Sequence, residues 1–178
     1  MKKIRVGVIG LGFIGKQHVE ALRRLPYIEI VAGSDSNLSM REWCEKNGIQ
    51  KYYSDYKEML TNENMDVVHN CTPNNFHYEV SCEILKTGCH VYSEKPLTIK
   101  SVEGESLIEL ADKKGLKTAV NFNYRNNLMV QEIQQRIQNG RMGMISHIQV
   151  EYLQDWLVYE KKRENCRKKR CKYRKGKH

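Results

Sequence analysis

The sequence predicts an α/β fold, in which a doubly wound parallel sheet carries helices on both faces and an incomplete second α/β domain follows. Short apolar segments rich in β-branched residues alternate with amphipathic helical segments over residues 4–120. A glycine-rich turn directly follows the first apolar segment. The pattern changes after residue 121, because residues 145–153 alternate apolar and polar side chains like a strand of a half-solvated sheet.

The first apolar segment, residues 4–9, is predicted to be a strand, and residues 13–25 a helix. Further strands are predicted at 27–33, 51–53, 65–70, 89–93 and 117–120. Further helices are predicted at 37–47, 56–61, 75–87, 101–114 and 127–139. Caps support these bounds: Asn37 and either Ser54 or Asp55 can begin helices, and Gly48, Gly88 and Gly115 follow helix ends.

Gly10, Gly12 and Gly15 form the pattern G-x-G-x-x-G between a predicted strand and a predicted helix. The first glycine permits a tight turn, the second lets a pyrophosphate approach the backbone, and the third lets the helix pack on the strand. The unpaired N–H groups and the positive dipole end of the new helix favour an anion. We therefore predict a dinucleotide phosphate site, with a purely structural glycine turn as the alternative.

Asp35 follows the second predicted strand, twenty residues after Gly15. A carboxylate there can accept hydrogen bonds from the adenosine ribose and would repel a 2′-phosphate, which favours NAD over NADP. Arg41, one turn into the next helix, keeps NADP open as an alternative. An Asp that only caps that helix is the structural alternative.

Polar residues also follow the next predicted strand, in the segment Cys71-Thr72-Pro73-Asn74. Pro73 restricts the chain direction, and Asn74 can cap the following helix and also face a cofactor. His77 lies three residues further on, and histidine is a common acid–base catalyst. We favour a helix-surface or capping role for His77 over catalysis.

The segment Glu94-Lys95-Pro96 follows the fifth predicted strand, and Asn123-Tyr124-Arg125 comes after the sixth. Because the carboxyl ends of parallel strands share one edge of a sheet, these segments are expected beside the glycine turn. Lys95 would then hold and polarise a substrate hydroxyl or assist its deprotonation, unless it is a plain surface lysine. The peptide bond before Pro96 is a candidate for the cis form.

In this order, the motifs GLGFIG, Asp35, CTPN with His77, EKP and NYR resemble those of the Gfo/Idh/MocA oxidoreductases over roughly residues 3–158. The resemblance implies a Rossmann domain that binds NAD(P), then an α/β domain with an open, mostly antiparallel sheet. Lys95 matches the family's catalytic lysine. The residues expected at the cofactor, from motif and resemblance, are Gly10, Gly12, Phe13, Ile14, Gly15, Asp35, Thr72, Asn74, His77, Glu94, Lys95 and Asn123.

The resemblance implies hydride transfer between the nicotinamide and a hydroxyl or ketone of a sugar or cyclitol. We predict a dinucleotide-binding domain at 1–121, the beginning of a substrate and oligomerisation domain at 122–160, and a basic tail at 161–178. Family members supply a second-domain motif, usually with an Asp and a His, whereas here the match fades near residue 160. We therefore expect a shortened form that binds cofactor with little or no activity, with a non-catalytic dinucleotide-binding module as the alternative.

The net charge of +9 comes from the tail. Residues 161–178 hold eleven of the 30 Lys and Arg residues and one of the 21 acidic residues, which leaves −1 for residues 1–160. Eleven cations can bind nucleic acid through phosphates, but the segment has one aromatic residue and no zinc-ligand spacing. A solvated tail is the favoured interpretation, and nucleic-acid binding the weaker alternative.

Length and composition narrow the class of protein further. The 178 residues suffice for one domain plus a fragment, and no apolar run is long enough to span a membrane. The six cysteines are scattered without C-x-x-C, and no signal peptide precedes the first strand, so we expect reduced thiols in a cytoplasmic protein. No metal site is expected, and a homo-oligomer stays open.

Overall fold

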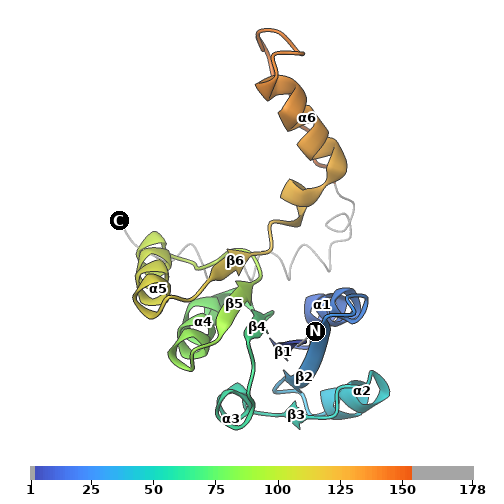
Figure 1. Cartoon of the computed structure of the whole chain (residues 1–178), viewed down its shortest axis with the longest axis vertical. Coiled ribbons are helices and arrows are strands. Elements are labelled where there is room, and N and C mark those ends of the chain that lie inside the picture. The colour runs from blue at the N-terminus through green and yellow to red at the C-terminus, as the bar shows by residue number, and fades with distance from the viewer. Residues whose placement is uncertain (1–2, 154–178) are drawn as a thin grey trace, which may run out of the picture. The chain divides into compact units, whose positions relative to one another are not determined.

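The structure is a computed structural model that describes residues 3–153. The chain divides into two compact units, 1–130 and 131–178. In the first unit, six described strands form one parallel sheet in the order β3-β2-β1-β4-β5-β6 (Figure 1). The strands are β1 (Ile4–Ile9), β2 (Ile28–Ser34), β3 (Tyr52–Tyr53), β4 (Val67–Asn70), β5 (His90–Ser93) and β6 (Thr118–Val120). The predicted doubly wound α/β fold is therefore confirmed.

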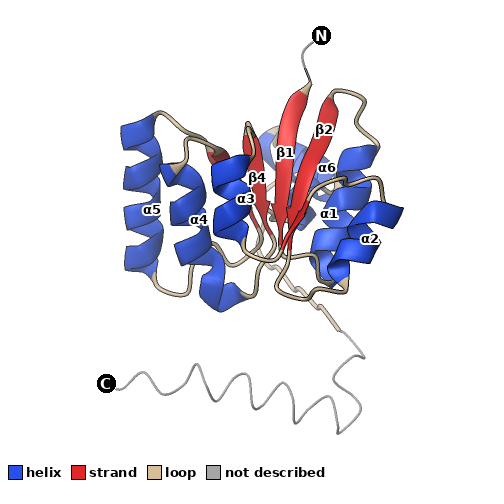
Figure 2. Ribbon diagram, turned by 90° about the horizontal axis from the view of Figure 1, so that it is seen from below, coloured by secondary structure: helices blue, strands red, loops and turns tan. Residues whose placement is uncertain are grey.

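Helices cover both faces of this sheet, with α1 and α2 on one face and α3, α4 and α5 on the other (Figure 2). They are α1 (Phe13–Arg23), α2 (Met40–Lys46), α3 (Tyr56–Asn62), α4 (His77–Lys86) and α5 (Ser101–Lys114). Because all strands run parallel, their carboxyl ends and the loops that follow them lie at one edge.

The strands alternate their side chains between two apolar cores. Val6 and Val8 of β1 are buried on the side of α1, where they pack with Val19 and Leu22. Gly7 faces the other side, and a side chain there would clash with the sulfur atom of Met65. The central strand β1 is buried on both faces from Val6 to Ile9, which explains why this part of the sequence is a nearly continuous apolar run.

Most predicted bounds agree with the structure within a few residues. The helix predicted at 101–114 is observed as Ser101–Lys114, and Gly115 follows it with a φ of +65°. The second helix begins at Met40 rather than at Asn37, because the Asn37 carboxamide oxygen accepts hydrogen bonds from the backbone N–H and hydroxyl of Ser39 in a local turn. The helix predicted at 75–87 begins as a 3-10 turn, Asn74–Phe76.

The helix α6 (Leu128–Gln138) extends from the first unit into the second, and Val130, Ile133 and Ile137 on it are exposed. The strand predicted at 145–153 is wrong, since none of these residues is in a strand. An extended segment becomes a strand only by pairing with another, and no strand of residues 3–153 pairs with this one. The predicted tail at 161–178 lies outside the described residues. No helix within residues 3–153 is long and apolar enough to cross a bilayer.

Candidate functional site

The turn between β1 and α1 contains three glycines with different surroundings. Gly10 has a φ of +87°, and a Cβ atom there would lie 2.6 Å from the carbonyl oxygen of Cys71. A Cβ atom on Gly15 would clash with the carbonyl oxygen of Gly10, so this glycine lets α1 approach the end of β1. A Cβ atom on Gly12 would meet nothing within 4 Å. The turn is thus tightly packed at two glycines and open at the third, as a phosphate cradle requires.

The first turn of α1 has the chemistry of an anion site. Gly12 is its N-cap, so no side chain accepts from the first N–H groups, and no acidic residue lies in this turn. Phe13 and Ile14 leave 78% and 42% of their surface exposed beside it. The free N–H groups and the helix dipole therefore face accessible space, where they attract negative charge.

Asp35 follows β2 and connects its end to the glycine turn. One carboxylate oxygen accepts from the Leu11 N–H at 2.7 Å, and the other accepts from the Asn37 N–H at 2.8 Å. The Tyr52 hydroxyl donates to the carbonyl oxygens of Asp35 and Asn37, at 2.5 and 3.1 Å. Each carboxylate oxygen keeps acceptor capacity for a ribose hydroxyl. Arg41 lies over the Tyr52 ring, 5.6 Å from its centroid.

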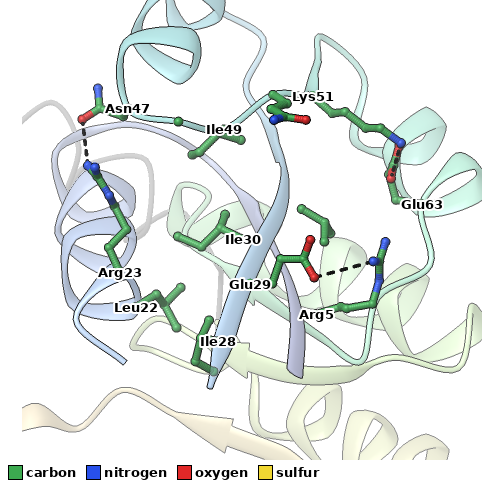
Figure 3. Close-up of a pocket in the computed structure, with 13 residues that line it drawn as sticks. Arg5, Leu22, Arg23, Ile28, Glu29, Ile30, Asn47, Ile49, Lys51 and Glu63 are labelled. Atoms are coloured by element: carbon green, nitrogen blue, oxygen red, sulfur yellow. Dashed lines mark hydrogen bonds and ion pairs between the residues drawn. The ribbon is translucent and has the colours of Figure 1, made fainter. Parts of the chain in front are cut away.

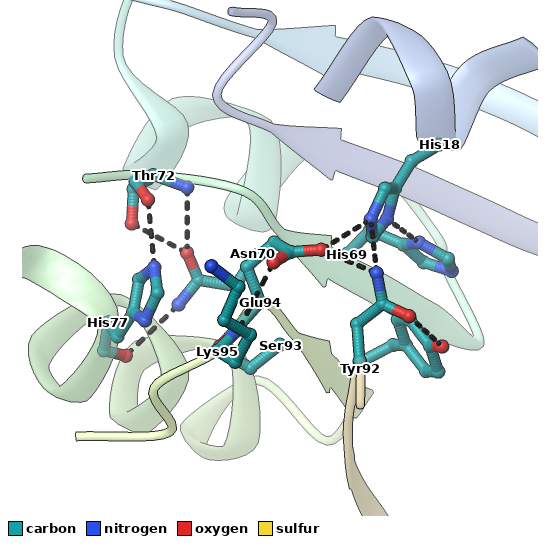
Figure 4. A network of polar contacts seen from close by, with 10 residues as sticks. His18, His69, Asn70, Thr72, His77, Tyr92, Ser93, Glu94 and Lys95 are labelled. Carbon is teal, nitrogen blue, oxygen red and sulfur yellow. Dashed lines mark hydrogen bonds and ion pairs between the residues drawn. The ribbon is translucent and has the colours of Figure 1, made fainter. Parts of the chain in front are cut away.

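The loop after β4 is held by buried polar groups (Figure 4). The Asn70 side chain accepts from the Thr72 N–H and hydroxyl, and it donates to the Ser81 hydroxyl and the His77 carbonyl oxygen. His77 is fully buried, with Nε2 2.8 Å from the carbonyl oxygen of Thr72. Its other ring nitrogen, Nδ1, lies 2.5 Å from the carbonyl oxygen of Pro96.

This burial bears on two expectations. The ring of His77 has no surface for a ligand, so neither the helix-surface role nor direct lining of a cofactor agrees with its position. The side chain of Asn74 is exposed, and it does not cap the turn that it begins, whose N-cap is Pro73. Thr72, in contrast, is half-buried and fixed by Asn70 at the loop's start.

Glu94 and Lys95 follow β5, and the Lys95–Pro96 peptide bond is cis, as the sequence suggested. Glu94 is only 8% exposed. Its Oε1 accepts from the Asn121 amide at 2.5 Å and lies 3.0 Å from His18 Nε2, and its Oε2 accepts from the Lys95 N–H at 3.2 Å. Lys95 itself is exposed, so a well-anchored turn presents its side chain to solvent.

Two shifted pKa values describe the charges of this network. Burial alone would raise the pKa of Glu94, but hydrogen bonds from Asn121, His18 and the Lys95 N–H outweigh burial and lower it. Burial, assisted by the neighbouring His18, lowers the pKa of His69 to about 3. His69 Nδ1 lies 2.9 Å from His18 Nδ1, and its ring stacks on Tyr92. Glu94 is therefore ionised, and the neutral His69 contacts it indirectly, through His18.

The structure brings most of the predicted site residues to the carboxyl edge of the sheet. The glycine turn, Asp35, the loop after β4 and the turn at Lys95 each follow a strand there, and Asn123 lies exposed in the 3-10 turn after β6. Sequence reasoning missed four polar residues behind this edge: His18 and Asn70, which are buried, and His69 and Asn121, which are half-buried. Their signals were weak: His18 is a polar residue on the apolar face of α1, and Asn70 ends a strand.

A separate cavity of about 590 Å³ lies at the opposite end of β1 and β2 (Figure 3). Three basic side chains contribute to its wall, but each is paired with an acid. Arg5 is 3.8 Å from Glu29, Lys51 is 2.9 Å from Glu63, and Arg23 is 3.4 Å from Glu20. No group of three metal-ligating side chains occurs within residues 3–153. The polar groups that converge on one place are therefore those of the carboxyl edge.

These features define a Rossmann domain of the dinucleotide-binding type. The chain belongs to the Gfo/Idh/MocA family, described as an oxidoreductase family with an NAD-binding Rossmann fold, and residues 4–122 match it.

The chain resembles curated and solved members of this family over about four fifths of its length. It is 33% identical to myo-inositol 2-dehydrogenase of Thermotoga maritima, over 79% of this chain and 42% of that protein. It is 35% identical to D-glucoside 3-dehydrogenase of Escherichia coli, over 80% and 41%. The crystal structure of the WlbA dehydrogenase from Bordetella pertussis in complex with NADH and UDP-GlcNAcA superposes with a TM-score of 0.76 at 29% identity, over 81% and 42%. The chain thus spans about two fifths of the length of these relatives.

Proposed function

We propose that the chain binds a nicotinamide dinucleotide at the carboxyl edge of its sheet and prefers NAD to NADP. The observation that carries this proposal is the glycine turn, in which Gly12 faces open space at an uncapped helix N-terminus. The Asp35 carboxylate beside the turn supports NAD, because a 2′-phosphate would meet a negative charge there. Arg41 is the nearby cation that NADP would need.

Each part of the edge has a proposed role. Gly10, Gly12, Gly15 and the first turn of α1 hold the pyrophosphate, and Asp35 accepts from the adenosine ribose. The residues proposed to line the rest of the cofactor are Phe13, Ile14, Thr72, Asn74, Glu94, Lys95 and Asn123. His77 is proposed to act from beneath this surface, since its ring is buried.

The proposed reaction is oxidation of a sugar or cyclitol hydroxyl, or reduction of the ketone. The bound nicotinamide supplies the hydride chemistry. The Lys95 ammonium holds and polarises the substrate oxygen, and its neutral form can take the hydroxyl proton. The substrate class is supported by relatives named as inositol and glucoside dehydrogenases.

We further propose that residues 1–121 form the dinucleotide domain and that 122–160 begin the substrate domain. By itself, the 178-residue chain is expected to bind cofactor and turn over slowly, because Lys95 is its one side chain matched to the family's catalytic groups. We also propose that the protein can form a homo-oligomer whose subunits pair through surfaces of the second domain.

The first test is calorimetric titration of the full chain with NAD⁺ and NADP⁺. Gly12→Glu should fold normally, since its side chain meets no neighbour, but its carboxylate would repel the pyrophosphate. We expect at least about a 100-fold loss of NAD⁺ affinity, roughly 2.7 kcal/mol. Gly12→Gln is the matched control for bulk without charge. Wild-type chain that binds neither dinucleotide, or Gly12→Glu that binds as well as wild type, would overturn the proposal.

The second test measures NADH formation from NAD⁺ with myo-inositol and with methyl glucoside. We expect little turnover by the chain alone. Substrate-dependent NADH formation that Lys95→Ala abolishes would confirm the role of Lys95 and refute the low-turnover expectation. Tight NAD⁺ binding without turnover, even when a full-length family member is active in the same assay, would favour a non-catalytic dinucleotide-binding module.

A further inference from the structure

The turn Glu94–Pro96, which we call the Lys95 turn, is held at its first residue by groups from distant segments. Glu94 Oε1 is 3.0 Å from Nε2 of His18, which lies on α1, the helix that begins at the glycine turn. The Asn121 amide, just after β6, donates to the same oxygen. The other carboxylate oxygen accepts from the Lys95 N–H. The buried Glu94 therefore connects α1 to the backbone of Lys95.

The turn is held at its last residue by a second buried histidine. His77 Nδ1 is 2.5 Å from the carbonyl oxygen of Pro96, and its Nε2 is 2.8 Å from the carbonyl oxygen of Thr72. The Asn70 amide donates to the His77 carbonyl oxygen at 3.0 Å, which fixes the start of α4. His77 thus connects the loop after β4 to the Lys95 turn. Figure 4 shows its contact with Thr72.

The directions of these hydrogen bonds follow from the acceptors. An ionised carboxylate and a carbonyl oxygen can only accept, so His18 donates to Glu94 and His77 donates to a main-chain oxygen. Leucine at position 18 would leave the buried Glu94 carboxylate with one donor fewer, which is costly away from water. Leucine at position 77 would remove the donor that holds a main-chain oxygen of the neighbouring loops. Both histidines are more than nine-tenths buried, so solvent would not replace the missing donor.

We propose that His18 and His77 are positioning residues that fix the backbone on both sides of Lys95 and couple the phosphate end of the cofactor site to its nicotinamide end. This inference rests on the proposed function. Neither histidine touches the cofactor. Each acts through one residue of the Lys95 turn, His18 through Glu94 and His77 through Pro96. Loss of either histidine loosens the turn while the glycine turn and Asp35 keep their own contacts.

The test compares two ligands that share the phosphate end. ADP-ribose has the adenosine, both phosphates and the distal ribose, whereas NAD⁺ adds the nicotinamide. Calorimetric affinities for both are measured with the full chain carrying His18→Leu, His77→Leu, His18→Gln or His77→Gln. Glutamine keeps an N–H donor. The matched control is His90→Leu, because His90 lies at the opposite end of β5 and its Nδ1 accepts from the Lys117 N–H.

For both leucine variants we expect NAD⁺ affinity to fall at least about tenfold and ADP-ribose affinity to fall less than about threefold. The glutamine variants should regain most of the difference, and His90→Leu should leave the ratio unchanged. An equal fall in the affinities for both ligands would show a merely structural role and overturn the inference. Affinities for both ligands that stay unchanged would overturn it as well.

A second variant and a second readout cover the remaining cases. If the leucine variants fail to fold, Glu94→Gln decides, because one of its carboxamide atoms would face an N–H group with the wrong polarity. The same shift in the ratio is expected, and its absence overturns the inference. NADH should protect Lys95 from acetylation, read by mass spectrometry, in wild type and less in the variants. Wild-type chain that binds neither NAD⁺ nor ADP-ribose would instead contradict the proposed function itself.

Discussion

The two edges of the parallel sheet both carry charged residues but use them differently. At the amino edge, Arg5, Arg23 and Lys51 surround a cavity, and each is paired with an acid on the surface or in the cavity wall. At the carboxyl edge, the polar groups are buried, and they hold main-chain atoms of neighbouring loops (Figure 4). At the amino edge, charged side chains pair with other charged side chains. At the carboxyl edge, polar side chains form hydrogen bonds that fix the loop backbone.

This difference shows which observation identifies the site. Exposed ion pairs such as Arg5–Glu29 and Arg23–Glu20 contribute little and occur on most protein surfaces. Glu63 is buried, but its partners are the side chains of Lys51 and Tyr53 rather than loop backbone. Buried polar groups are costly unless every partner is supplied, so a cluster that aims its bonds at loop backbone requires a specific arrangement of those loops. A cavity volume alone would have pointed to the amino edge, although the groups that we propose bind a dinucleotide lie at the other edge.

The largest effect is expected for Gly15→Ala at the carboxyl edge. The added methyl group would clash with the carbonyl oxygen of Gly10, so α1 must move away from β1. We expect a loss of about 3 kcal/mol of unfolding free energy and no measurable NAD⁺ binding. Gly12→Ala is the control, because its methyl group meets nothing within 4 Å and should cost less than about 0.5 kcal/mol. Urea unfolding and calorimetry measure both, and equal stabilities would contradict the packing role of Gly15.

The next effect is a pH dependence of stability from His69. Its pKa is about 3 in the folded chain, against roughly 6.5 when unfolded, so the unfolded chain takes up the proton first as the pH falls. Its stabilising contribution is complete above pH about 6.5. It is lost by about 1.4 kcal/mol per pH unit between there and the folded pKa.

His69→Phe keeps a ring against Tyr92 but cannot titrate. Urea unfolding at several pH values between about 7 and 5 should therefore give a steeper loss of stability for wild type than for His69→Phe. Groups that do not contact His69 cancel in this difference. Parallel curves would show that His69 is not held neutral in the folded chain.

Asp35 gives an intermediate effect on cofactor choice. Asp35→Ser removes the charge that a 2′-phosphate would meet, together with the acceptor for the ribose. We expect the NAD⁺ to NADP⁺ affinity ratio to fall about tenfold, or about 1.4 kcal/mol. The control is Glu29→Ser, which removes an acid near the start of β2, the strand that Asp35 follows, and it should leave the ratio unchanged. If the NAD⁺ to NADP⁺ affinity ratio fell equally in both variants, the net charge of the chain, rather than the position of Asp35, would explain the change.

The sequence predicted the fold well because its signals were local. Continuous β-branched runs between capped helices have few other interpretations, and the glycine after Lys114 ended its helix as expected. The prediction at 145–153 was wrong for a non-local reason. Alternating polarity shows that a segment is suited to a strand, but not that a partner strand lies beside it.

The sequence predicted the residues in the loops at the sheet edge, but not the polar residues beneath them. Gly10, Asp35 and Lys95 lie in motifs with fixed spacing, so the sequence alone located them at the sheet edge. His18 and Asn121 are 103 residues apart in the chain, yet both contact Glu94, and their side chains lie 3.3 Å from each other. No short motif reveals such a meeting. The sequence marks His77 as a helix-surface residue or a catalyst, but its side chain is fully buried and contacts loop backbone instead.

The smallest effect is expected for Arg23→Ala at the amino edge. Arg23 lies on α1, like His18, but it is about half exposed, and its contacts with Glu20 and Asn47 are both 3.4 Å long. Exposed pairs of this kind contribute less than about 0.5 kcal/mol, and no bond leads from Arg23 to the Lys95 turn. We therefore expect unchanged NAD⁺ affinity and nearly unchanged urea unfolding. If Arg23→Ala weakened NAD⁺ binding as much as we expect His18→Leu to do, any disturbance of α1 would weaken binding. The effect of His18→Leu could then not be assigned to the contact between His18 and Glu94.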